Sequence, residues 1–136
     1  MGVVIVDRIP DEWRPIRKLG PDQWVAKRGA KKRLGDFWCL CQGFALLVEC
    51  KRSRSTLPYS ALRPHQVVAL DRVDQLGHLS ALWWQEVATG RCWLLPWRST
   101  GLAPRRSVSV AVAERIAIRS LDDMSRAWNN SDRRGD

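Results

Sequence analysis

Histidine is scarce in this 136-residue chain, which contains only His65 and His78. A Ser-His-Asp hydrolase needs a histidine as its general base, so this scarcity argues against that class of enzyme. The four cysteines include no Cys-x-x-Cys pair and no Cys/His set with zinc-finger spacing. We therefore expect buried free thiols and no zinc site.

Long apolar runs are also absent. No stretch approaches the roughly 18 uninterrupted apolar residues that span a bilayer. The N-terminal sequence MGVVIVDRIPDEW reaches charged residues too early for a signal peptide. The chain contains no internal repeat, low-complexity tract or linker. These absences predict one soluble, cytoplasmic domain over residues 1–136, with no membrane partner.

Positive charge is abundant, because 23 lysine and arginine residues face 14 aspartate and glutamate residues and give a formal net charge of +9. An excess of this size on a short chain indicates a polyanionic partner, of which nucleic acid is the commonest. Hydrophobic residues make up 45% of the chain, enough for one packed core, which argues against a disordered basic tail.

Apolar patterning predicts an α/β fold that begins with strands. Residues 3–6 form a β-branched run typical of a strand, whereas the prolines and glycines of residues 10–21 exclude one long helix there. The apolar runs 36–41 and 44–48 are separated by Gln42-Gly43, which predicts a β-hairpin. The second run is apolar on both faces, as in a central strand covered by helices.

The second half of the chain continues this alternation. Apolar residues at spacings of three and four predict an amphipathic helix over 61–76, ended by Gly77. Residues 79–87 and 91–97 predict a second hairpin around Thr89-Gly90, and a further helix begins near Leu121.

The eight tryptophans could form core, a subunit interface or a surface for stacking unpaired bases. Trp38, Trp83 and Trp93 alternate with other apolar residues, so we expect them to be internal. The residues we expect to be exposed are Trp13, Trp24 and Trp97.

Glu49, Cys50 and Lys51 follow the apolar strand directly. Side chains two apart on a strand share a face, so Glu49 and Lys51 project together and Cys50 points to the opposite face. Two ions at the end of a buried strand cost several kcal/mol each unless they are paired or bind a metal. The predicted hairpin also brings Asp36 to this end, so two carboxylates and one lysine converge.

This combination of groups suits phosphodiester hydrolysis. Two carboxylates and the backbone carbonyl of Cys50 can hold an octahedral Mg²⁺ that retains water. The ion then polarises the phosphate and activates a water, while Lys51 orients that water and offsets negative charge. The alternative is a plain salt bridge between Lys51 and Glu49 or Asp36, with no catalysis.

The ordered set Asp36, Glu49-Cys50-Lys51 and His65-Gln66 resembles the PD-(D/E)XK nuclease superfamily, and within it the RecU/Hjc-type Holliday-junction resolvases, particularly the small phage-encoded ones. The resemblance covers residues 28–97. It implies a single restriction-endonuclease-like domain, with a central mixed sheet flanked by helices and a C-terminal extension over 105–136.

The resemblance also implies the roles of the site residues. Asp36 and Glu49 would bind Mg²⁺, with Mn²⁺ as a substitute, and the backbone carbonyl of Cys50 would complete the set. Lys51 would be the catalytic lysine, and Gln66 would face the active site. The alternative for Gln66 is an exposed amide at the start of a helix.

Many members of the superfamily carry a further glutamate on an N-terminal helix. The only glutamate before Asp36 is Glu12, whose surroundings are rich in proline. Either Glu12 contributes to the metal site, or Asp7 or Asp11 takes its place, or the role is missing.

Basic residues lie just before Asp36 and just after Lys51, so positive charge flanks the site on both sides in sequence. We expect these residues to contact DNA phosphates, although a solvated charge run is the alternative. Arg105-Arg106 and Arg133-Arg134 could extend this surface. The predicted DNA-binding residues are Lys27, Arg28, Lys31, Lys32, Arg33, Arg52, Arg54 and Arg63.

The leading hypothesis is a Mg²⁺-dependent endonuclease that cuts four-way DNA junctions in a bacterial, archaeal or phage-infected host cell, without a small-molecule cofactor. The resemblance implies a homodimer, whose two-fold symmetry would match the two strands of a junction. One alternative is another nuclease of the superfamily, such as a VRR-Nuc-like flap or repair nuclease. The other is a non-catalytic basic nucleic-acid-binding protein.

Overall fold

A computed structural model of the chain describes residues 3–8, 13–20, 23–28, 35–41 and 43–132, and the side chains of 35–41 and 43–130. Its main sheet has five strands in the order β1-β4-β5-β7-β8. Their bounds are Val3–Arg8 (β1), Phe37–Cys41 (β4), Phe44–Ser53 (β5), Leu79–Glu86 (β7) and Cys92–Pro96 (β8).

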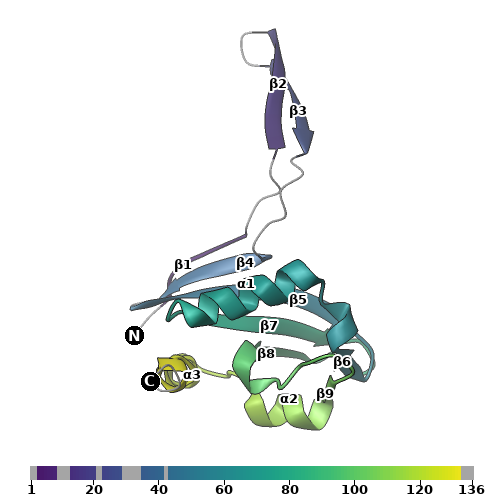
Figure 1. The fold of residues 1–136 in the computed structure, drawn as a ribbon, viewed down its shortest axis with the longest axis vertical. Helices are drawn as coiled ribbons and strands as arrows, with labels where there is room; N and C mark the ends of the chain where they lie inside the picture. The colour runs from purple at the N-terminus through teal and green to yellow at the C-terminus, as the bar shows by residue number, and fades with distance from the viewer. Residues whose placement is uncertain (1–2, 9–12, 21–22, 29–34, 42, 133–136) are drawn as a thin grey trace.

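Three helices and two small strand pairs complete the described part of the chain. The helices are α1 (Pro64–Gln75), α2 (Val110–Ile116) and α3 (Leu121–Asp132), with short 3₁₀ turns at Tyr59–Ala61 and Trp97–Ser99. The small pairs are β2 (Trp13–Gly20) with β3 (Gln23–Arg28), and β6 (Thr56–Pro58) with β9 (Ser107–Ser109). Figure 1 shows the β2–β3 ribbon standing away from the five-stranded sheet.

The main sheet is mixed. β1, β4 and β5 are successive antiparallel neighbours, whereas β5 and β7 are parallel and β7 and β8 antiparallel. A parallel pair needs a crossover connection, and α1 supplies it between β5 and β7. The predicted α/β class with a central mixed sheet and helices is therefore confirmed.

The β4–β5 hairpin forms where the sequence predicts it. Cys41 pairs with Phe44, and Gly43 adopts a φ of +101°, a conformation that residues with a side chain rarely adopt. β5 is the middle strand of the sheet, and its residues from Leu46 to Glu49 are all buried. The expected central strand, apolar on both faces, is thus present.

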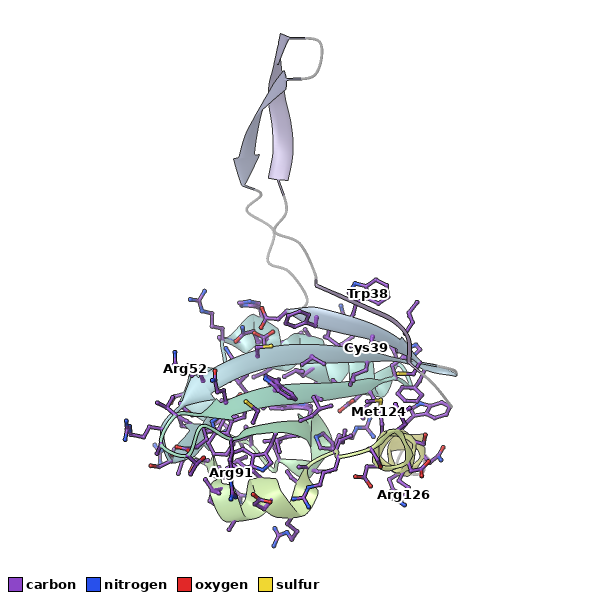
Figure 2. All side chains as sticks on the ribbon, turned by 180° about the vertical axis from the view of Figure 1, so that it is seen from behind. Trp38, Cys39, Arg52, Arg91, Met124 and Arg126 are labelled. Atoms are coloured by element: carbon purple, nitrogen blue, oxygen red, sulfur yellow. The ribbon has the colours of Figure 1, made fainter. Side chains whose placement is uncertain are left out.

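Each face of the sheet has its own core. On one face, Leu82 and Trp84 of β7 pack with Leu70 of α1 and Ala113 of α2. On the other, Leu46 and Val48 of β5 belong to a cluster with Leu79 and with Met124 of α3. Figure 1 shows α1 lying across the sheet, and in Figure 2 Met124 is on the side of α3 that is directed at the sheet. Glu49 and Lys51 alternate with Val48 and Cys50, so they lie on the face that α1 covers.

The helix expected over 61–76 is α1, which begins at Pro64 and ends before Gly77. Proline suits the first turn of a helix because the N–H that it lacks would have no partner inside the helix. Gly77 has a φ of +83°, in keeping with its predicted role as the helix terminator. The strand at 3–6, the second hairpin and the helix near Leu121 are present as β1, β7–β8 and α3.

Two tryptophan predictions are wrong. Trp83 is 42% exposed, because α3 covers Leu79 and Ala81 on its side of β7 but not the later position of Trp83. Trp97 is buried, since it packs into the core beside α1 and its Nε1 donates to Asp71 Oδ1 at 2.7 Å. Trp93 is buried and Trp38 half-buried, whereas the side chains of Trp13 and Trp24 lie outside the described ones.

All four cysteines are free thiols, as expected. Burial raises the pKa of the Cys41 thiol, and burial followed by the neighbouring Cys41 raises the pKa of Cys39. Cys92 is exposed, which corrects the expectation that every thiol is buried.

The C-terminal segment 105–136 contributes to the core through β9 and α2. Val108 and Ala113 are fully buried in the cluster that also contains Leu57 and Leu62. In the part of the chain that the structure describes, no helix is long and apolar enough to cross a membrane.

Glu86 joins two turns at the end of β7. Its side chain is fully buried and accepts the backbone N–H groups of Ser55, Ala88 and Thr89 at 2.6–2.8 Å, and the Thr89 hydroxyl at 2.6 Å. The Thr89 side-chain hydrogen bond, followed by the Ser55 backbone hydrogen bond, lowers the pKa of Glu86 from 4.5 to about 2. The ionised carboxylate therefore holds the turns together.

This arrangement predicts a pH-dependent effect of Glu86→Gln. Because the pKa is lowered on folding, the carboxylate stabilises the protein above about pH 4.5, and this contribution is lost as the pH falls towards 2. The Tm of Glu86→Gln should lie below that of the wild type at pH 6, and the difference should shrink between pH 4.5 and 2. Asp122→Asn, at an exposed acid in α3, is the control. A Tm difference that does not change with pH would contradict the role of the charge.

Candidate active site

Gln66 connects Glu49 and Lys51 through its side-chain amide. Its Nε2 donates to Glu49 Oε1 at 2.5 Å, and its Oε1 accepts from Lys51 Nζ at 2.9 Å. Lys51 Nζ also lies 3.8 Å from Glu49 Oε1, so the two charged groups form an ion pair. The face predicted to carry Glu49 and Lys51 is thus the one that meets the start of α1.

The position of Gln66 is fixed by the first turn of α1. Its Oε1 also accepts the backbone N–H of Arg63 at 2.9 Å, and its own backbone N–H donates to the Arg63 carbonyl. The amide cannot turn over without losing these hydrogen bonds, because its oxygen accepts from two donors and its nitrogen faces a carboxylate. Gln66 is therefore half-buried and held in place, in contrast to the alternative of an exposed amide.

Asp36 reaches the same site from the neighbouring strand. Its backbone N–H donates to the Val48 carbonyl at 3.0 Å, and its Oδ2 accepts the backbone N–H of Cys50 at 2.8 Å. The register pairs Phe37 with Val48, so Asp36 lies beside Glu49 across the hairpin. The hairpin thus brings Asp36 to Glu49 and Lys51, and Cys50 turns its side chain to the opposite core.

The charged groups of the site are largely removed from water. The side chain of Glu49 is 6% exposed and that of Lys51 16%. Burying a carboxylate and an ammonium carries a desolvation cost that their ion pair and the Gln66 hydrogen bonds offset. The site therefore combines a buried negative group with a largely buried positive one.

The strand register also bears on the further acid expected from the N-terminus. Asp7 of β1 is the partner of Trp38, which in turn is the partner of Leu47. Paired residues share a face, so Asp7 lies at a position on the face that carries Glu49. The other two candidates, Asp11 and Glu12, lie outside the described residues.

The predicted DNA-binding residues divide into three groups. Arg52, Arg54 and Arg63 are exposed, and of these Arg63 adjoins the site through its backbone N–H to Gln66. Lys27 and Arg28 end β3, where the backbone but not the side chains is described. Outside the described residues lie Lys31, Lys32 and Arg33.

No group of three His, Cys, Asp or Glu side chains that could hold a metal occurs in the part of the chain that the structure describes. The ligand set expected from the sequence differs from such a group, since it combines the two carboxylates of Asp36 and Glu49 with a backbone carbonyl. The sequence does not predict that Asp36 accepts the backbone N–H of Cys50, because this hydrogen bond depends on the exact register of the hairpin.

Replacing Gln66 with alanine should destabilise the protein. The change removes hydrogen bonds to two charged groups and leaves Glu49 buried with fewer donors, a loss of about 1–3 kcal/mol in the free energy of unfolding. Urea denaturation measures it. The matched control is Gln75→Ala in the last turn of the same helix, where the side chain is exposed and the expected change is below about 0.5 kcal/mol. Equal effects of the two substitutions would contradict the bridging role.

A scan of protein-family models and a search of curated proteins each found no match to this chain. Its function is therefore inferred from its own residues and topology.

Proposed function

We propose that this protein is a metal-dependent endonuclease that hydrolyses phosphodiester bonds in branched DNA, with four-way junctions as its substrate. The observation that carries the proposal is that Gln66 bonds both Glu49 and Lys51, while Asp36 accepts the backbone N–H of Cys50 between them. A carboxylate pair, a lysine and a positioning amide are the groups that the PD-(D/E)XK resemblance requires.

The topology supports the same superfamily. An antiparallel β1-β4-β5 meander leads through α1 to a parallel strand β7, and the site lies where β5 meets the start of α1. A central mixed sheet flanked by helices is what the restriction-endonuclease-like resemblance implies. Such a domain assigns to the central strand the acid-x-lysine motif, which is Glu49-Cys50-Lys51 here.

The donor chemistry of the site suits a hard cation. Carboxylate and carbonyl oxygens are the ligands that Mg²⁺ prefers, whereas the nearby Cys50 side chain packs in the opposite core. Asp36, Glu49 and the Cys50 carbonyl would hold Mg²⁺ or its substitute Mn²⁺. When bound, the ion would neutralise charge on the phosphate and lower the pKa of a coordinated water.

The other groups of the site act without a bound ion. Lys51 presents an ammonium that Gln66 Oε1 holds in place, so it can orient an attacking water and stabilise negative charge on the phosphate. The net charge of +9 and the exposed Arg52, Arg54 and Arg63 favour an approach by DNA. We propose a homodimer acting in the cytoplasm, because two symmetric sites would cut the two strands of a junction.

A panel of labelled substrates tests the proposal. Four-way junctions, flaps and linear duplexes of the same sequence are incubated with and without Mg²⁺, and products are resolved by strand. We expect cleavage of the junction at symmetric positions, only with metal. Equal cutting of all substrates would indicate a flap or repair nuclease of the same superfamily. Salt-sensitive binding without cleavage would indicate a binding protein.

A further inference from the structure

A hollow of about 250 Å³ lies between β6 with its following turn and the segment that leads into β9. Four residues with a hydroxyl group and two arginines line it, and among the residues that the structure describes no acidic residue does. These residues are Thr56, Tyr59, Ser60 and Ser107, and Arg105 and Arg106. Donors without an opposing negative charge are what a phosphate group requires.

The two arginines of this hollow are not engaged within the protein. Within the described ranges, the side chains of Arg105 and Arg106 are exposed and make no hydrogen bond or ion pair with other residues. Other arginines of this half of the chain do pair, as Arg91 and Arg119 do with Glu114. The pair at the hollow is therefore available to an anion from solution.

The backbone holds the walls of the hollow in a defined position. Tyr59 N–H donates to the Arg106 carbonyl at 2.9 Å, and β6 pairs with β9 through Leu57 and Val108, both fully buried. Arg105 adopts a φ of +68°, which residues with a side chain rarely do, in the turn closed by Arg106 N–H and the Ala103 carbonyl. The two arginines thus lie in a hydrogen-bonded turn that leads directly into the β6–β9 pair.

A larger neighbouring hollow of about 390 Å³ shares Tyr59 but has different chemistry. Asp71 lines it together with apolar groups such as Trp97 and Leu102, and its one arginine, Arg98, is paired with Asp74 Oδ2 at 3.2 Å. The carboxylate of Asp71 accepts the Trp97 indole N–H at 2.7 Å and would repel a phosphate. A phosphate is therefore expected in the smaller hollow and not in this one.

A short segment of chain links the hollow to the candidate active site. β6 contacts β5, and the chain continues from Tyr59 to Arg63, whose backbone N–H donates to Gln66. We propose that the hollow binds a backbone phosphate of the DNA strand, beside the phosphodiester that is cut at Glu49 and Lys51. This inference rests on the proposed function. Free inorganic phosphate has the same chemistry as a backbone phosphate, so the test distinguishes the two.

The test measures DNA binding without cleavage. A fluorescein-labelled four-way junction is titrated in the presence of a chelator at several NaCl concentrations, using wild type and Arg105→Gln/Arg106→Gln. The slope of log Kd against log salt should fall by about one to two, because one or two phosphate contacts are lost. The matched control is Arg72→Gln/Arg115→Gln, which removes two exposed arginines and should keep the wild-type slope. Both double variants should unfold at the wild-type temperature.

Calorimetric titration with inorganic phosphate separates the two sources of the anion. If the Arg105/Arg106 variant loses affinity for inorganic phosphate but keeps the wild-type salt slope with DNA, the DNA assignment is overturned. Unchanged binding of both probes overturns the site altogether. If the wild type cleaves the junction and the Arg105/Arg106 variant keeps the wild-type salt slope, the proposed function stands and this inference fails. If the variant has a lower slope but the wild type cleaves nothing, the phosphate site stands and the proposed nuclease function fails.

Discussion

Lys51→Ala is expected to lower the rate of four-way junction cleavage by about 10²–10⁴-fold while DNA binding changes little. The lysine is the only cation held by Gln66 Oε1 among the described residues. Without the Lys51 ammonium, no nearby positive charge from this side chain would stabilise the negative charge that develops on the phosphate. Single-turnover cleavage at saturating enzyme measures the chemical step, and anisotropy measures binding.

The neighbouring Arg52→Ala is the matched control for Lys51→Ala. Arg52 is exposed on the other face of β5, so its loss should weaken DNA binding slightly and leave single-turnover cleavage within a few fold of wild type. Undiminished turnover by Lys51→Ala would exclude the proposed catalytic role. A loss of turnover that follows a loss of folding would show in the thermal unfolding curve, and the longer Lys51→Met variant then provides the same test.

Asp36→Asn is expected to reduce cleavage by more than about 100-fold and to weaken Mn²⁺ binding. Substitution of a residue that hydrogen-bonds to a metal ligand typically costs about 10–100-fold in metal affinity or activity. The loss of the ligand Asp36 itself should exceed that range. The asparagine Oδ1 can still accept the Cys50 backbone N–H, and therefore the hairpin should remain intact. Electron paramagnetic resonance of Mn²⁺ measures the affinity independently of cleavage.

Asp122→Asn serves as the control for Asp36→Asn, because it removes one exposed carboxylate far along the chain in α3. Its Mn²⁺ affinity and cleavage rate should match those of the wild type. If Asp36→Asn bound Mn²⁺ as the wild type does, the carboxylate would have a structural role only, as the acceptor for Cys50 N–H.

Short-range sequence patterns predict much of the fold. Gln42-Gly43 between two apolar runs predicts the β4–β5 hairpin, and the period of two places Glu49 and Lys51 on one face. The spacing of apolar residues over 61–76 predicts α1, and Gly77 predicts its end. These features depend on neighbours within about a dozen residues, which is why sequence reasoning finds them.

Other elements depend on distant partners. β9 pairs with β6 about fifty positions earlier, and α2 is held by the burial of Ala113 against the sheet, so neither has a strong local pattern. The prolines and glycines of residues 10–21 obscure the alternation of β2, so local patterning does not predict the β2–β3 ribbon. Local alternation predicts Trp83 in the core, because it does not reveal where a covering helix stops.

The candidate site also combines features that local patterns predict with features that depend on distant partners. Periodicity predicts that Asp36, Glu49 and Lys51 converge, but the contact of Gln66 with both charged groups requires α1 to pack against β5 with the right offset. The resemblance to a family supplied that expectation, whereas apolar spacing alone did not. The Arg105–Arg106 hollow joins two segments that nothing in the local sequence connects.

Cleavage of a strand-labelled four-way junction by the wild-type protein, with Mg²⁺ and with chelator, tests the central claim most directly, with Lys51→Ala measured in parallel. We expect symmetric nicks near the branch point with Mg²⁺, none with chelator, and a rate about 10²–10⁴-fold lower for Lys51→Ala. Absence of nicks in every condition, or equal nicking by wild type and Lys51→Ala, would contradict the assignment of Asp36, Glu49, Lys51 and Gln66 as a nuclease active site.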